Sequence, residues 1–117
     1  MKTATIDSEK AFELMYELFK AKPWLNSAGI MTEKDHPFED EALAFLLTLE
    51  SADGWGSCAE PARRVVNSLL LDFMAKLHDH FSRRVWTIPA GLPPWRQAAR
   101  IIRAEIDESH PHFSKTQ

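Results

Sequence analysis

The chain has 117 residues, of which 44% are hydrophobic and 26% are charged, and its formal net charge is −3. This composition is ordinary for a folded domain and excludes a wholly disordered chain, while the length predicts one domain with one hydrophobic core. No apolar run approaches the roughly 20 residues of a membrane-spanning helix, and the amino-terminal segment lacks the apolar core of a secretory signal, so we expect a cytoplasmic protein with no membrane partner.

The first predicted helix covers residues 8–21, after a short segment, residues 1–6, that we expect to fray. Asp7 is a candidate N-cap because its carboxylate can accept a hydrogen bond from the first turn. Four large side chains recur at the spacing of one helical face: Phe12, Met15, Tyr16 and Phe19. Pro23 ends this helix because proline removes a backbone donor and pushes the preceding residue out of helical geometry.

A long loop and a second helix follow. The loop lacks a repeating pattern but carries several large apolar side chains, so we expect it to pack against the core. The second helix begins within residues 35–41, where a cap candidate, a proline and three successive carboxylates, Glu39 to Glu41, favour a helix start. It is predicted to end near Ser51.

The third predicted helix begins at 58–61 and continues to about Arg83. Its core stripe consists of Val66, Leu69, Leu70, Phe73, Leu77 and Phe81, and its opposite face of Arg64, Ser68, Asp72, Lys76, Asp79 and Arg83. Opposite charges stand four residues apart on that second face, which is typical of a solvated helix surface.

The fourth predicted helix runs from Pro94 to about Glu108 and has two neighbouring rows at the same spacing. One row is apolar: Trp95, Ala99, Ile102 and Ile106. The other is charged: Arg96, Arg100, Arg103 and Asp107. The connector that precedes it contains three prolines and a glycine, so we expect it to be extended, and its residues 85–88 are the one candidate strand.

Residues 1–117 are therefore predicted to form a single helical domain with frayed ends, residues 1–6 and 109–117. The fold class is all-α: a bundle of about four helices with a long packed loop between the first two.

Charge is distributed unevenly along the chain. Residues 1–53 contain 11 acidic and 5 basic side chains, whereas residues 54–117 contain 6 acidic and 9 basic ones. Five arginines and two tryptophans gather in residues 83–103, and Arg and Trp are the residue types enriched in protein-binding hot spots. The predicted binding residues are Arg83, Arg84, Trp86, Trp95, Arg96, Arg100 and Arg103.

These residues allow more than one interpretation. The arginines can form a solvated face whose charges are paired within the chain, with Glu39 to Glu41 as partners, and the tryptophans can close the ends of the bundle. As a binding surface, they favour a non-catalytic adaptor, inhibitor or regulatory module whose partner is another protein with an acidic surface, or a second copy of the chain. The alternative is a nucleic-acid-associated helical protein whose arginines contact phosphates, although such domains usually have a pI above about 9 and this chain has a pI of 5.9.

The sequence predicts no catalytic residue, no metal site and no cofactor. His78 and His80 are two residues apart, so a helix turns them away from each other, and His36, His110 and His112 could converge only through the tail. Cys58 is the only cysteine, which excludes a disulfide within the chain, and its neighbours match no protease or redox pattern.

Overall fold

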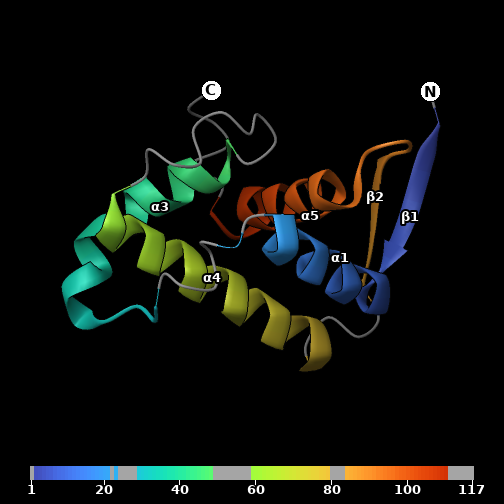
Figure 1. Cartoon of the computed structure of the whole chain (residues 1–117). Coiled ribbons are helices and arrows are strands. Elements are labelled where there is room, and N and C mark those ends of the chain that lie inside the picture. Colours follow the sequence, from blue (N-terminus) through green and yellow to red (C-terminus); the bar gives the residue numbers. More distant parts are fainter. Residues whose placement is uncertain (1, 22, 24–28, 49–58, 80–83, 111–117) are drawn as a thin grey trace.

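The computed structural model describes residues 2–21, 23, 29–48, 59–79 and 84–110. Within these ranges the chain is mostly helical, with one short sheet (Figure 1). In chain order the elements are β1 (Thr3–Asp7), α1 (Ser8–Ala21), the 3-10 helix η1 (Glu33–Phe38), α3 (Glu39–Leu46), α4 (Glu60–Asp79), β2 (Val85–Pro89) and α5 (Pro94–Ser109).

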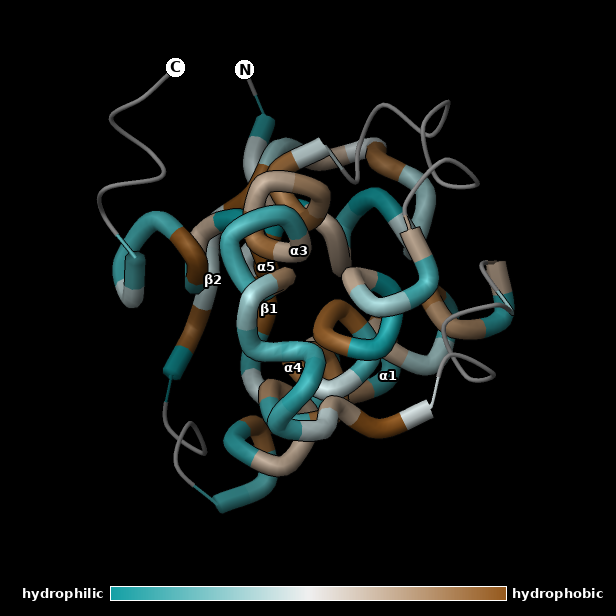
Figure 2. Tube along the Cα trace, turned by 90° about the vertical axis from the view of Figure 1, so that its left-hand side faces the viewer, coloured by the Kyte–Doolittle hydropathy of each residue, from teal (hydrophilic) through white to brown (hydrophobic). Residues whose placement is uncertain are grey.

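The helices pack around one hydrophobic core. Helix α1 contacts both α4 and α5, and α3 packs against α4. Hydrophobic and hydrophilic residues alternate along the helices, as expected of elements that bury one face (Figure 2). The largest fully buried side chains are Leu14, Met15, Leu18, Val65, Val66, Leu70 and Ile101. Among the described residues, no helix is both long enough and apolar enough to cross a membrane.

A two-stranded antiparallel sheet corrects the all-α prediction. Strand β1 pairs with β2, and the segment expected to fray at residues 1–6 forms most of β1. Both strands have the two-residue period of a half-buried sheet: Ile6 in β1 and Trp86 and Ile88 in β2 are buried, whereas their neighbours along each strand are more exposed. The candidate strand at residues 85–88 is confirmed, and β1 is the partner that the sequence interpretation lacked.

The predicted bounds of the first, third and fourth helices are confirmed over the described residues. On the first helix, Tyr16, predicted to share a face with Met15 and Phe19, is 55% exposed while those two are buried. Asp7 caps α1 as expected, because its Oδ1 accepts the backbone N–H of Lys10 at 2.8 Å.

The second helix differs from the prediction. The second predicted helix is α3, which begins at Glu39, within the predicted residues 35–41, and the 3-10 helix η1 precedes it as an element that was not predicted. Helix α3 ends at Leu46, followed by a turn at Leu47 and Thr48, so the predicted end near Ser51 is wrong. Ser109, expected to fray, is the last residue of α5. The end of the third helix near Arg83 and the tail beyond His110 lie outside the described residues.

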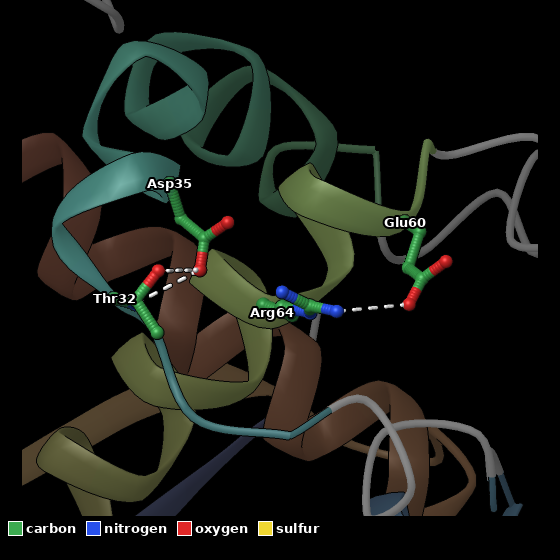
Figure 3. A network of polar contacts seen from close by, with 4 residues as sticks. All are labelled: Thr32, Asp35, Glu60 and Arg64. Carbon is green, nitrogen blue, oxygen red and sulfur yellow. Dashed lines mark hydrogen bonds and ion pairs between the residues drawn. The ribbon is translucent and has the colours of Figure 1, made fainter.

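Side-chain hydrogen bonds and an ion pair hold the start of η1 and the first turn of α4 (Figure 3). The Oδ2 atom of Asp35 accepts hydrogen bonds from the backbone N–H of Thr32 at 2.8 Å and from its Oγ1 at 3.1 Å. On α4, Arg64 Nη2 lies 3.1 Å from Glu60 Oε1, one turn away. The exposed face predicted for this helix therefore carries a local ion pair at its start.

The described part of the long loop packs against α4, as predicted. The side-chain amide of Asn67 donates to the carbonyl of Gly29, whose φ of 83° suits glycine, and Ser68 Oγ accepts the N–H of Met31. Ser68 was expected on the solvated face of the helix. It is half-buried instead, because the loop covers it.

Candidate binding surface

The predicted binding residues fall into two groups in the structure. Arg83 lies outside the described residues. Arg84 and Trp86 belong to an internal network, whereas Arg96, Arg100 and Arg103 follow the outer side of α5, after Trp95 at the start of this helix.

Trp86 is part of the core. Its side chain projects inward from β2, where it is only 5% exposed, and its Nε1–H donates to Glu105 Oε1 at 2.8 Å. The ring of Phe73 on α4 meets the indole edge to face, with centroids 6.3 Å apart. Trp86 therefore joins β2 to α4 and α5, and its indole does not form part of an exposed aromatic patch.

Arg84 is paired within the chain. Its Nη2 lies 3.0 Å from Glu105 Oε1 and also contacts Glu108, and its guanidinium carbon lies 5.7 Å from the centroid of the Trp86 ring. The hydrogen bond to Glu108 raises the pKa of Arg84, and the attraction of Glu105 and Glu108 adds to this effect, while partial burial opposes it. The charge of Arg84 is thus compensated by α5, and not by the predicted partners Glu39 to Glu41.

The charged row of α5 has the predicted orientation. Arg96 and Arg100 are exposed and Arg103 is half-buried, while the opposite face of the helix buries Ala98, Ala99, Ile101, Ile102, Glu105 and Ile106. At the start of the helix, the half-buried Trp95 packs against the core, and the guanidinium of Arg96 lies 6.0 Å from its ring centroid. Three guanidinium groups therefore follow one another along a solvent-facing side of α5.

A cleft of about 360 Å³ separates β2 from this row. Strand β2 forms one wall, and the side of α5 that carries Arg100, Arg103, Ala104 and Asp107 forms the other. The lining residues are Val85, Trp86, Thr87, Ile88, Pro89, Arg100, Arg103, Ala104 and Asp107. We call this feature the β2–α5 groove. Three of the predicted binding residues, Trp86, Arg100 and Arg103, line the groove, but the sequence alone does not bring them together, because the position of β2 depends on its pairing with β1.

A second hollow lies between α3, α4 and α5, on the other side of α5. It has a volume of about 90 Å³ and an apolar lining that includes Leu46, Leu70 and Ile102, with Lys76 and Glu105 among its polar residues. Small-molecule sites usually have volumes of roughly 300–1,000 Å³. This hollow is therefore too small for a typical ligand or cofactor.

The described residues contain no group of three or more histidine, cysteine, aspartate or glutamate side chains placed to hold a metal ion. Of the residues considered for chemistry, Cys58, His80 and His112 lie outside the described part of the chain. His78 is exposed near the end of α4, and His110 follows α5 at the rim of the small apolar hollow.

Comparison with protein-family models, with curated proteins and with solved structures finds no match to this chain. The function of the chain must therefore be inferred from the geometry of its own site.

Proposed function

We propose that this protein is a non-catalytic protein-binding module, acting as an adaptor, an inhibitor or a regulatory subunit, and that its partner docks in the β2–α5 groove. One observation carries the proposal: strand β2 and the arginines Arg100 and Arg103 line the two walls of a single cleft. Such a cleft offers backbone hydrogen bonds and positive charge to the same ligand.

The spacing of the arginines supports a role outside the helix. Arg96, Arg100 and Arg103 are four and three residues apart, so each lies beside a like charge on the helix surface. Like charges at this spacing destabilise a helix by a few tenths of a kcal/mol per pair. Arginine is, in addition, well suited to contact a partner through several hydrogen bonds and its planar face.

The charge of the whole chain favours a protein partner over nucleic acid. The net charge is −3, and Asp107 lines the same groove as the arginines. A phosphate backbone would meet this carboxylate as well as the guanidinium groups, and it would approach a molecule with an overall negative charge. A protein segment can place an acidic side chain at the arginines and another residue type beside Asp107.

Capture from cells that express the protein tests the proposal. The immobilised full chain is compared with Arg100→Glu, which reverses the charge in the groove, and with Lys34→Glu, which makes the same change in η1, away from β2 and α5. We expect a protein that the wild type and Lys34→Glu retain, that Arg100→Glu loses, and that survives nuclease treatment.

Two results would contradict the proposed function. Capture that disappears after nuclease treatment would indicate a nucleic-acid ligand. Equal capture by all three chains would show that the groove is not the contact surface. If the retained protein were a second copy of the chain, the binding would be self-association, and light scattering would check the oligomeric state.

A further inference from the structure

The hydrogen-bond register of the sheet fixes which backbone groups of β2 point away from β1. The N–H of Ala90 donates to the carbonyl of Lys2 at 3.1 Å, so the ladder continues one pair beyond the strands. Hydrogen-bonded and non-hydrogen-bonded pairs alternate in an antiparallel ladder. In the register of this sheet, the hydrogen-bonded pairs are consequently Ala4 with Ile88 and Ile6 with Trp86.

The remaining pairs turn their backbone groups outward. Val85, Thr87 and Pro89 of β2 occupy non-hydrogen-bonded positions, opposite Asp7, Thr5 and Thr3. Their N–H and C=O groups therefore point away from β1. Pro89 agrees with this assignment, because a proline, which has no N–H, is tolerated where a ladder bond is not needed. Val85 and Thr87 are exposed, and among the described residues the sheet has no third strand.

This outer edge borders the β2–α5 groove. All five residues of β2 line the cleft and no residue of β1 does, so the cleft lies on the side of β2 away from its partner strand. Figure 1 shows the same order, with β2 between β1 and α5. The outward N–H and C=O groups and the arginines of α5 thus face one open space.

We propose that the partner inserts an extended acidic segment into this groove, as a third strand that pairs with the outer edge of β2. This inference rests on the proposed function and specifies how the partner binds. Addition of a strand to an exposed sheet edge is a general mode of peptide recognition, in which the backbone supplies affinity and alternate side chains supply specificity.

The arginines on the other wall of the groove select an acidic ligand. Arg100 and Arg103 line the cleft together with all five residues of β2. Figure 1 shows β2 steeply inclined to α5, so a third strand beside β2 would cross the helix and would not follow its axis. Alternate side chains of a strand point to the same face, so a segment with acidic residues at every second position would present a row of carboxylates to the helix where it passes the two guanidinium groups.

A fluorescein-labelled decapeptide of alternating valine and glutamate is the probe, and fluorescence anisotropy with the full chain is the measurement. The decisive variant is Thr87→Pro, which removes an outward N–H of β2 without removing a bond to β1. Its matched control is Thr5→Pro, the cross-strand neighbour, whose N–H points to the opposite edge of the sheet. We expect at least a tenfold loss of affinity with Thr87→Pro and less than a twofold change with Thr5→Pro.

Two further probes test the same contacts. Replacement of glutamate by lysine in the peptide should abolish binding, and Arg100→Gln in the protein should weaken it several-fold. If circular dichroism shows that either proline variant is unfolded, peptides N-methylated at alternate residues replace that comparison: one alternation should lose binding to the wild type and the other should keep it.

The outcomes separate the strand mode from the proposed function. Equal binding by the two proline variants, or by the two N-methylated peptides, would overturn strand pairing, even if Arg100→Gln weakened binding. An absence of binding to the wild type, or equal binding of the lysine peptide, would also overturn it. In each case the proposed function would still stand if the captured protein were lost with Arg100→Glu and retained with Lys34→Glu.

Discussion

At the scale of single residues, Glu105 is the least expected feature of the molecule. Its side chain lies on the side of α5 that faces the core, where the residue is 8% exposed. Its Oε1 accepts a hydrogen bond from the indole N–H of Trp86 and forms an ion pair with the guanidinium of Arg84. A buried carboxylate is tolerated only when it is paired and hydrogen-bonded. Glu105 therefore couples the orientation of α5 to that of β2.

The hydrogen bond between Trp86 and Glu105 can be tested by Trp86→Phe, which keeps an aromatic ring against Phe73 but removes the donor. We expect a loss of about 1–3 kcal/mol in the free energy of unfolding, because a buried acceptor loses one partner and the smaller ring packs less completely. Urea denaturation measures the loss. A double-mutant cycle with Glu105→Gln should give a coupling of at least about 0.5 kcal/mol; additive effects would show that the two side chains act independently.

The raised pKa of Arg84 makes a prediction about alkaline pH. A group whose pKa is higher in the folded state contributes stability that is present below the unfolded-state pKa and is lost only as pH rises through the folded-state pKa. For Arg84 that loss lies at extreme alkaline pH. The difference in unfolding free energy between wild type and Arg84→Met should therefore be constant from pH 7 to pH 10, and a decline over this range would contradict the arginine pairing.

At the scale of elements, the junction of β1 and α1 depends on one carboxylate. Asp7 ends the strand and caps the helix through its hydrogen bond to the N–H of Lys10. Asp7→Ala should lower the free energy of unfolding by about 1 kcal/mol, whereas Asp7→Asn should retain most of it, because the amide oxygen also caps. Thermal denaturation followed by circular dichroism compares the two variants, and equal losses would indicate that the charge matters more than the cap.

On helix α5, the effect of a substitution on binding can be measured separately from its effect on stability. Arg100 is exposed between two other arginines, so Arg100→Gln removes like-charge repulsion without opening a cavity. We expect the free energy of unfolding to stay within about 0.5 kcal/mol of the wild-type value or to rise slightly. Urea denaturation checks this, and a loss above about 1 kcal/mol would assign Arg100 a structural role.

Long-range pairing explains which elements the sequence could predict. Helical periodicity extends over three or more turns in α1, α4 and α5, so each helix is identified by its own residues. Strand β1 has only two inward side chains, Ala4 and Ile6, and its partner begins about 80 residues later in the chain. Five residues with this weak pattern form a strand only when β2 is beside them, and the residues near β1 in the sequence do not indicate that pairing.

The candidate site was predictable to a similar extent. The spacing of Arg96, Arg100 and Arg103 placed them on one face of a helix, and that face is outward. The same spacing could not show that Trp86 turns inward, because the direction of its side chain depends on the register of β2 with β1. It also could not show that Arg84 pairs with Glu105 and Glu108, 21 and 24 residues further along the chain.

At the scale of the whole molecule, the pairing of Arg84 does not change the uneven charge distribution along the chain. Arg84 and both of its carboxylate partners belong to the basic half of the chain, residues 54–117. On α5, Arg100 and Arg103 place two guanidinium groups in the β2–α5 groove of a molecule with a net charge of −3. The positive field of these guanidinium groups attracts an acidic segment from solution, whereas the net negative charge of the molecule repels acidic ligands from its other surfaces.

The two walls of the β2–α5 groove should consequently act on different steps of binding. Exposed charges mainly affect the rate of association, whereas contacts that form only in the docked complex mainly affect dissociation. With the valine–glutamate peptide in stopped-flow experiments, Arg100→Gln should slow association and reduce its dependence on salt, because fewer charges attract the ligand. Thr87→Pro should leave association within about twofold and accelerate dissociation, because the missing N–H is used only in the paired strand. If both variants changed the same rate constant, the arginines and the strand edge would not have the separate roles that the groove assigns to them.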